Sequence, residues 1–289
     1  MIRYLNFLID CMKTGFKFFT YPALQKAKIL AENNLSFWAG IYYLDLKEYI
    51  DAAICFEKAH AYKHLIICYQ KQGLYHKAIA LADEKKYYER GAKICLHIQN
   101  IKKAAYFYSY FDIQKAAKLY LSEQAYYEAG YCFLQNYDAL KAIDCFKRCK
   151  NSLEKDRGLK EVGEFALVLY FTKQYDEAFK IFIALDDYYS ALECANQMKE
   201  EKLIASTRLL IGEIEAEKKH YTFAAKCVEP YNPHQAVYYY NLDKAYSESI
   251  RLLLSTGEYE KAIQLCLLDH NLNQAYEIAS TYNPELLSS

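Results

Sequence analysis

Two histidines, His60 and His64, stand four residues apart, which is the spacing that lets two side chains on one helix bind the same metal ion. A repeat unit begins between them at Tyr62, so we expect a turn there and place the two histidines on different segments. A zinc site needs three or four ligands, and no carboxylate or cysteine stands at a suitable third position. We interpret the pair as two surface histidines at a turn and expect no metal ion or other cofactor.

The chain has ten cysteines, of which Cys145 and Cys149 are also four residues apart. The neighbouring Lys147 and Arg148 could lower the pKa of a nearby thiol, which would make it reactive. The alternative is a structural thiol, because cysteines recur at helix-core positions, where a free cysteine acts as a small hydrophobe. With no Cys-x-x-Cys motif, we favour reduced structural thiols and a cytoplasmic location.

Acidic pairs provide the remaining candidates for chemistry. Asp186 and Asp187 could act as paired carboxylates, and Asp269 stands beside His270. Asp186 and Asp187 come just before the anchor Tyr188, and Asp269 and His270 precede Asn271 in a similar turn, so helix capping explains both pairs. The chain contains none of the nucleophile-elbow, phosphate-loop, dinucleotide-binding or His-Glu-x-x-His motifs. We therefore expect that the protein is not an enzyme.

Composition limits the classes of partner. Of the 289 residues, 53% are hydrophobic, and Lys+Arg and Asp+Glu both total 36, so the formal net charge is zero. Nucleic-acid binders usually carry a basic excess, so we do not expect nucleic acid as the primary partner. No apolar run reaches the 18 residues of a membrane span. The apolar start, residues 1–20, is interpreted as a helix that caps the fold, with a signal peptide as the alternative.

An internal repeat organises the chain. Its anchor residues are 13 apart, except for one step of 12 from Ile101 to Ile113. Residues 3, 4, 6 and 7 places after an anchor are small or apolar, which puts them on one face of a helix. Small residues at offsets 3 and 4 let the next helix approach, and a large residue at offset 7 fills the space. The anchors are Tyr49, Tyr62, Tyr75, Tyr88, Ile101, Ile113, Tyr126 and Ala139.

Each unit leaves about 10 residues for helix, or about 15 Å, which is too short to be stable alone in water. The units must therefore stack. We expect N-caps at Asn100, Asp112, Asp138, Asp187 and Asn271, and left-handed helix ends at Gly73 and Gly257.

The organisation that follows is an all-α fold, a right-handed α-α superhelix (solenoid) of stacked short helical hairpins. We predict capping helices over 1–35, a regular solenoid over 36–151 and a less regular continuation over 152–289. Longer helices are expected at 152–174 and 201–220, with a proline-bounded loop near 229–234.

The unit that begins at Tyr49, with Ala52, Phe56 and Ala59 following, resembles the second helix of a tetratricopeptide repeat. The segments Gly73–Ala78 and Gly257–Ala262 resemble the turn between the two helices of that repeat. That family repeats every 34 residues, whereas a pair of units here takes about 26. In this shortness the chain is similar to the solenoids of vesicle-coat and intraflagellar-transport subunits and to repeat tails of some helicases. The resemblance implies a groove or an edge that binds peptides or proteins.

Three tyrosines break the pattern. Offsets 5 and 9 should point away from the adjacent helix and are polar in several units, but Tyr106 and Tyr110 occupy both in one unit, and Tyr131 takes offset 5 two units later. Tyrosine is enriched in binding hot spots, so we predict a recognition stripe at these three residues. The alternative is that curvature buries this face and makes the three ordinary core.

We therefore expect a protein–protein interaction scaffold or adaptor that binds a peptide or a folded protein. The alternatives are a structural solenoid segment of a larger assembly or longer polypeptide, and an enzyme without a recognisable motif. The chain could be a monomer or part of an assembly, and an assembly piece would self-associate.

Overall fold

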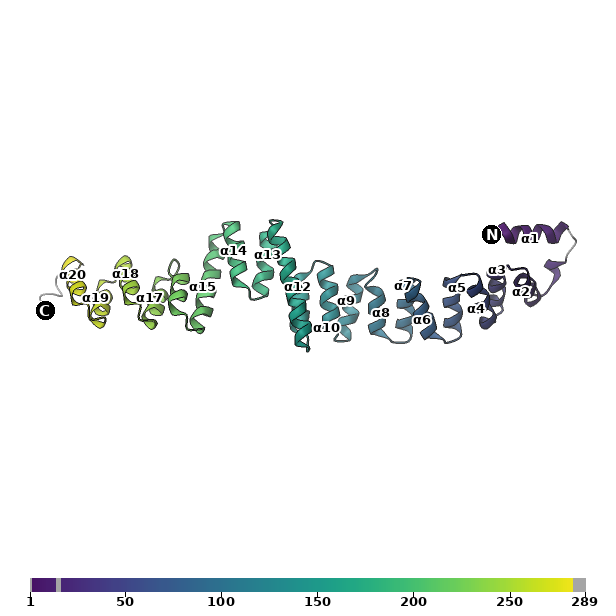
Figure 1. Cartoon of the computed structure of the whole chain (residues 1–289), viewed down its shortest axis with the longest axis horizontal. Coiled ribbons are helices and arrows are strands. Elements are labelled where there is room, and N and C mark those ends of the chain that lie inside the picture. Colours follow the sequence, from purple (N-terminus) through teal and green to yellow (C-terminus); the bar gives the residue numbers. More distant parts are fainter. Residues whose placement is uncertain (1, 14–16, 283–289) are drawn as a thin grey trace. The chain divides into compact units, whose positions relative to one another are not determined.

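The computed structural model describes residues 2–13 and 17–282, and within these ranges it contains helices and no strand. The helices follow one another in chain order (Figure 1). The prediction of an all-α solenoid is confirmed, while the right-handedness of its superhelix stays a prediction. The capping segment 1–35 and the last segment, 152–289, extend into residues outside those that the structure describes.

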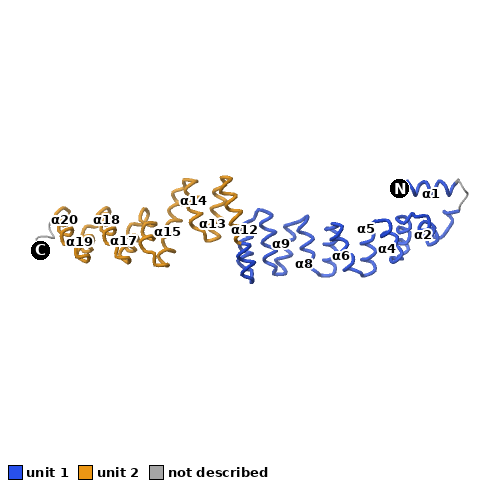
Figure 2. The backbone as a smooth tube through the Cα atoms, in the orientation of Figure 1, with its two compact units in different colours: residues 1–158 blue, residues 159–289 orange. Residues whose placement is uncertain are grey.

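Two compact units divide the chain, residues 1–158 and 159–289, and the boundary falls within α12 (Figure 2). The first unit contains α1 (Ile2–Lys13), the short turn η1 (Phe18–Thr20), α2 (Ala23–Glu32), α3 (Ser36–Asp45), α4 (Tyr49–Lys58), α5 (Tyr62–Lys71), α6 (Tyr75–Glu84), α7 (Tyr88–His97), α8 (Ile101–Tyr108), α9 (Ile113–Ser122), α10 (Tyr126–Gln135), α11 (Ala139–Lys147) and the start of α12 (Ser152–Phe171).

The second unit continues through the rest of α12 and eight further helices. These are α13 (Tyr175–Ala184), α14 (Tyr188–Met198), α15 (Glu201–Glu217), α16 (Tyr221–Val228), α17 (Pro233–Leu242), α18 (Tyr246–Thr256), α19 (Tyr259–Leu268) and α20 (Leu272–Tyr282). The longer α12 and α15 confirm the two long helices that the sequence predicts. From α2 to α11 and from α13 to α20, each helix packs against the helix that follows it, as expected for repeats that contact only their neighbours.

Close packing between successive helices depends on small residues that receive an aromatic ring. In three places a glycine lies against a phenylalanine 16 residues later (40 to 56, 91 to 107 and 130 to 146). A Cβ atom on Gly130 would lie 2.6 Å from the Phe146 ring, and one on Gly91 would lie 2.7 Å from Phe107. The sequence prediction that small residues admit a large neighbour is thus confirmed, and the three phenylalanines are fully buried.

The turns share one conformation. The residue two places before most helices has a positive φ, and the following N–H closes the helix end, as when Ala61 donates to the carbonyl of Phe56 at 2.8 Å. Gly73 and Gly257 adopt this conformation as predicted, with φ of 74° and 79°. Thirteen other residues also do so, which no sequence signal indicated: Asn34, Lys47, His60, Lys86, Gln99, Gln124, Tyr137, Lys173, Asp186, Lys199, Lys219, Lys244 and His270.

Two turns differ, and one of them corrects a prediction. The proline-bounded loop expected near 229–234 is a short turn, because Pro233 is already the first residue of α17. Proline suits this place, where no N–H is needed within the helix. Asn232 caps α17 by accepting a hydrogen bond from the N–H of Gln235, and Asp112 caps α9 in the same way. These two turns follow eight-residue helices, which accounts for the step of 12 between Ile101 and Ile113.

The other predicted N-caps are confirmed. Asn100, Asp138, Asp187 and Asn271 each accept a hydrogen bond from the backbone N–H three residues later. A side-chain cap of this kind typically stabilises a helix by about 1 kcal/mol, which matters for helices of eight to eleven residues.

Candidate functional site

Tyr106 and Tyr110, two of the three predicted stripe residues, lie together at the end of α8. The Tyr110 hydroxyl donates to the Tyr106 hydroxyl at 2.9 Å, and Tyr106 donates to Asp83 of α6 at 3.2 Å. The Lys103 ammonium donates to Asp83 at 2.8 Å and lies 4.1 Å from the centre of the Tyr106 ring. Hydrogen bonding to Tyr110, together with burial and the Asp83 charge, raises the pKa of the Tyr106 phenol. These four residues form what we call the Tyr106 network.

Burial distinguishes the two tyrosines. Tyr106 is half-buried, whereas Tyr110 is 50% exposed and stacks on Tyr88 of α7 with ring centres 4.1 Å apart and planes at 8°. Tyr106 therefore supports Tyr110, and Tyr110 supports Tyr88.

Tyr131, the third predicted residue, lies on α10 and is half-buried. Its ring packs edge-on against Tyr127, with centres 4.9 Å apart, and against Phe146, at 5.6 Å. The Tyr127 hydroxyl donates to the Tyr131 hydroxyl at 3.3 Å. Tyr131 thus belongs to the packing between α10 and α11, while Tyr106 and Tyr110 adjoin α6 and α7. Its role in recognition stays a prediction.

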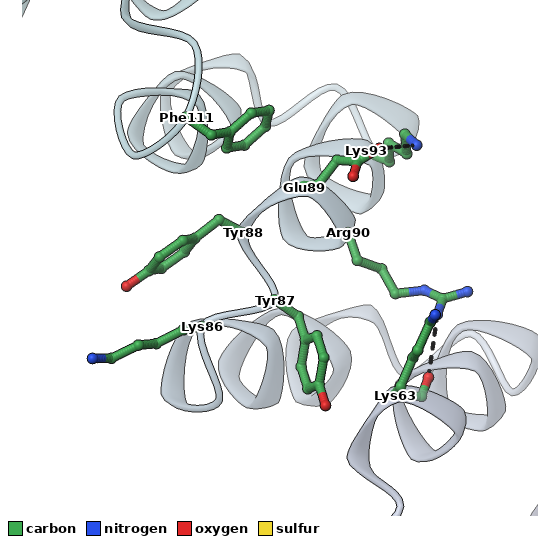
Figure 3. Close-up of a pocket in the computed structure, with 8 residues that line it drawn as sticks. All are labelled: Lys63, Lys86, Tyr87, Tyr88, Glu89, Arg90, Lys93 and Phe111. Carbon is green, nitrogen blue, oxygen red and sulfur yellow. Dashed lines mark hydrogen bonds and ion pairs between the residues drawn. The ribbon is translucent and has the colours of Figure 1, made fainter.

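An open groove of about 640 Å³ lies beside the Tyr106 network, in the first unit (Figure 3). Its walls come from α5, from the turn before α7 and the start of α7, and from the turn before α9. The lining residues, which we call the α7 groove, are Lys63, Lys86, Tyr87, Tyr88, Glu89, Arg90, Lys93 and Phe111. Tyr88 lines the groove and stacks on Tyr110 of the Tyr106 network, so the Tyr88–Tyr110 pair joins the network to the groove.

The α7 groove is positively charged although the chain as a whole is neutral. Four cationic side chains line it against one carboxylate, Glu89, which is paired with Lys93 at 2.6 Å. Among the described residues, Lys63, Lys86 and Arg90 form no ion pair. Arg90 instead donates to the backbone carbonyl of Lys63 at 3.3 Å, and Figure 3 shows these two side chains on one side of the groove, with Lys86 and Tyr88 on the other.

Sequence signals found only part of this groove. Tyr88 was recognised as a repeat anchor, whereas the exposed Phe111, in the turn after α8, was not assigned to a site. Lys63 lies on α5, whereas the other three cations lie on α7 or in the turn before it. They meet in one groove only because α5 and α7 lie next to each other. A visible signal was the run from Lys85 to Arg90, in which a pair of tyrosines at a turn is flanked by charged residues on both sides.

The predicted histidine pair is divided by the start of α5. His60 lies in the turn with φ of 51°, and His64 lies on α5 with its ring stacked 5.0 Å from that of Phe56. Burial, and then the charges of Lys63 and Arg90, lower the pKa of His64. The described residues hold no group of three or more histidine, cysteine, aspartate or glutamate side chains that could bind a metal ion.

Cys145 and Cys149 share the end of α11 and the turn that follows it. Burial raises the pKa of the Cys145 thiol to about 11, and burial also raises that of Cys149. The Cys149 thiol donates to the Cys145 carbonyl, with sulfur and oxygen 3.6 Å apart. Both thiols are therefore protonated at neutral pH, which opposes the alternative in which Lys147 and Arg148 activate them.

The acidic pairs act as turn residues. Asp187 caps α14, and Asp186 has a left-handed backbone and accepts a hydrogen bond from the Tyr188 hydroxyl at 3.1 Å. His270 is likewise the left-handed residue of the turn before α20. These positions agree with the capping interpretation.

A buried carboxylate in the second unit, Glu215 of α15, went unnoticed in the sequence. It accepts hydrogen bonds from Lys218 at 2.8 Å and from Tyr189 at 3.1 Å, and its other oxygen lies 2.8 Å from Nδ1 of His220. These contacts, those of Lys218 and His220 foremost, lower the pKa of Glu215 from 4.5 to about 2. Tyr189 lies on α14, and Lys218 and His220 lie in the turn after α15. Glu215 therefore ties α15 to α14 and to this turn.

Acid should weaken the second unit through Glu215. Its pKa is lower in the folded protein than in the unfolded chain, so its stabilising effect is complete above about pH 4.5 and is lost as pH falls towards 2. We expect the wild-type melting temperature to fall between pH 5 and 3 more steeply than that of Glu215→Gln. The measurement is circular dichroism melting at half-unit pH steps. Parallel curves for the two proteins would contradict the assignment, and Glu217→Gln, an exposed neighbour, serves as the control.

None of the helices in the described ranges is long and apolar enough to cross a membrane. No family model matches the chain, and no curated protein matches it. Among solved structures, the chain is similar to one titled "Structure of Naa15/Naa10 bound to HypK-THB", with 12% sequence identity and a TM-score of 0.28 over 96% of this chain. The match spans 63% of that other chain. The helices described above define the class of protein as an all-α helical-repeat solenoid.

Proposed function

We propose that the protein is a protein-interaction scaffold that holds a segment of another protein in the α7 groove. The observation that carries this proposal is the meeting of exposed cations and aromatic rings from several helices in one open groove. Aromatic residues and arginine are enriched at binding hot spots because they bury area and still form polar contacts. An open groove suits an extended segment better than an enclosed small molecule, which normally occupies a deeper cleft.

Charge favours an acidic segment. Lys63, Lys86 and Arg90 form no ion pair among the described residues, so a partner carboxylate would gain a charge-assisted hydrogen bond without displacing an existing ion pair. The Tyr88 ring, fixed by stacking on Tyr110, and the exposed Phe111 provide apolar surface beside these charges. The chain's net charge of zero favours a protein partner over a polyanion such as nucleic acid.

Rigidity supports the same function. The groove walls are helix ends and short turns, and Tyr88 is held by Tyr110, which is held by Tyr106 and through it by Asp83. A preformed wall loses little conformational entropy on binding. The proposed function is non-catalytic, and the buried thiols at helix-core positions fit a protein of a reducing compartment such as the cytoplasm.

The test is affinity capture from cell lysate followed by mass spectrometry. We expect Lys86→Glu/Arg90→Glu to reduce capture of specific proteins by about tenfold or more, which corresponds to a combined cost of at least about 1.4 kcal/mol for the two lost charge contacts. The matched control is Lys202→Glu/Lys244→Glu, two exposed lysines of the second unit. A groove variant that melts like wild type and captures every protein that wild type captures would overturn the proposal.

The predicted tyrosine stripe is tested in the same experiment. Tyr106→Ser/Tyr110→Ser removes the support of Tyr88, and Tyr131→Ser alone probes the separate packing on α10. Loss of partners by the double variant at unchanged melting temperature supports recognition by this surface. A large fall in melting temperature for either variant assigns its tyrosines to the core instead.

A further inference from the structure

One side of the α7 groove holds two cations that lack a counter-ion. Lys63 on α5 and Arg90 on α7 lie together on this side (Figure 3), and neither forms an ion pair among the described residues. Burial is the main cause that lowers the pKa of His64 on α5, and the charges of Lys63 and Arg90 add to it. Both cations therefore act on the same ring, and they concentrate positive charge at one place in the groove.

The acidic side chains around this place are already engaged. Glu89, the only carboxylate that lines the groove, is paired with Lys93 at 2.6 Å. Glu84, at the end of α6, is paired with Lys85 at 2.8 Å. Two like charges on one side of a groove repel each other, and a groove lined by one sign of charge attracts ligands of the other sign. The two cations therefore favour an anionic ligand.

Arg90 is held in a direction that suits such a ligand. Its Nη1 atom donates to the backbone carbonyl of Lys63 at 3.3 Å, and the side chain is half-buried. A guanidinium group has five N–H donors in a planar fork, so most of these donors stay available after that contact. A fork oriented in this way can bind two oxygens of one anion at once.

We propose that this side of the α7 groove binds the phosphate group of a phosphorylated residue in the partner segment. The inference rests on the proposed function and names the chemical group that the groove recognises. A phosphorylated side chain has about −1.5 to −2 charge at pH 7 and three acceptor oxygens. One such group can accept hydrogen bonds from the Arg90 fork and from the Lys63 ammonium together, and it neutralises both cations. A carboxylate has a single charge and leaves one of the two cations without a counter-ion.

Binding to peptide arrays tests the preference for phosphate. The probe is a degenerate peptide library whose fixed central residue is phosphoserine, phosphothreonine or phosphotyrosine, with matched sets that carry the unmodified residue or glutamate. We expect at least one phosphorylated set to retain about tenfold more of the full chain than both of its matched sets.

Two array results would overturn the inference. Equal retention by the glutamate and phosphorylated sets would show that the groove binds acidic segments without a preference for phosphate, and the proposed function would stand. Retention by none of the sets would also overturn the inference, and the lysate capture described above would then decide separately whether the groove binds proteins.

Charge variants assign the preference to the two cations. Lys63→Gln and Arg90→Gln should each lower retention by the phosphorylated set about tenfold or more. Arg90→Lys keeps the charge but loses the fork, so its retention should lie between those of Arg90→Gln and wild type. The matched control is Lys118→Gln, at an exposed lysine of α9 that does not line the groove.

Circular dichroism melting of each variant separates binding from folding. If Arg90→Gln melts at a lower temperature than wild type, the exposed Lys63 provides the test by itself. A preference for phosphorylated peptides that is unchanged in a folded Lys63→Gln variant would overturn the inference.

Other phosphate-bearing molecules provide the last comparison. Vesicles of phosphatidylcholine with 5% phosphatidylinositol bisphosphate, and a single-stranded RNA, are tested for binding to the full chain and to Arg90→Gln, at about 5% lipid, a content at which a basic cluster binds anionic headgroups. We expect neither to compete with the phosphorylated peptides. Binding of the vesicles or the RNA that is lost in Arg90→Gln, while the phosphorylated peptides stay unbound, would assign the cations to that ligand and overturn the inference.

Discussion

Phe146→Ala is expected to lower the free energy of unfolding of the first unit by about 3–5 kcal/mol, the range for removing a buried aromatic ring. Phe146 is fully buried, its ring lies against Gly130 and Gly158, and it also contacts Tyr127 and Tyr131. Because this ring packs against Gly130 of α10 and Gly158 of α12, its removal would leave a cavity where α10, α11 and α12 meet. The measurement is urea unfolding followed by circular dichroism, with hydrogen exchange over residues 126–158.

Two further variants make the test specific. Leu140→Ala, at an exposed position of the same helix, should cost well under 1 kcal/mol. Gly130→Ala should cost about 1–3 kcal/mol by overpacking, since its Cβ would meet the Phe146 ring. Combined with Phe146→Leu, its cost should be smaller than the sum of the single costs, because the two residues share one contact. Additive costs would show that the ring does not lie on Gly130.

Tyr240→Ala is expected to destabilise the second unit by a similar amount, about 3–5 kcal/mol. Tyr240 on α17 is 1% exposed, and its hydroxyl donates to Glu229 at 2.9 Å. Arg251 of α18 donates to the other oxygen of Glu229 at 2.7 Å. Burial, followed by the hydrogen bond to Glu229, raises the pKa of Tyr240 to about 12. The residue therefore joins the core of α16 and α17 to an ion pair that reaches α18.

Tyr240→Phe separates the two contributions. It keeps the ring and removes only the hydrogen bond to a carboxylate, which costs about 1.5–3 kcal/mol, at the lower end here because Arg251 remains bound to Glu229. Trp38, the only tryptophan, lies in the first unit, so its fluorescence should be unchanged while hydrogen exchange accelerates over residues 221–256. If Tyr238→Ala, at the exposed position two residues earlier, cost as much as Tyr240→Ala, the burial argument would be wrong.

The tyrosine run at 238–240 shows what the sequence pattern missed. The repeat pattern gave this run no register, because the anchors between residues 201 and 258 were not recognised; the step from Tyr221 to Pro233 is 12 residues instead of 13. The structure places Pro233 as the first residue of α17, which puts Tyr239 and Tyr240 at offsets 6 and 7, the inward positions. The rule that the regular units displayed would have found them once that shorter turn was known.

The helices, their caps and their inward faces could be predicted from the amino-acid sequence. These are local properties, since the 3.6-residue period, the Asp and Asn caps and the small residues at offsets 3 and 4 act within one unit or between adjacent units. The pairing of Gly130 with Phe146 follows from the same repeat. Because these features depend on residues close together in the chain, the spacing of residues in the sequence is enough to predict them.

Which surface groups lie next to each other depends on how the helices pack in the tertiary structure. Lys63 lies on α5 and Arg90 on α7, and Tyr110, just after α8, stacks on Tyr88 of α7, so the α7 groove exists only after these helices have packed together. Tyr131 was predicted in the same stripe from its offset alone, yet its packing partners are Tyr127 and Phe146. An offset fixes the direction of a side chain on its own helix, whereas its neighbours depend on how successive helices are rotated, and that rotation is set by the packing of many side chains at once.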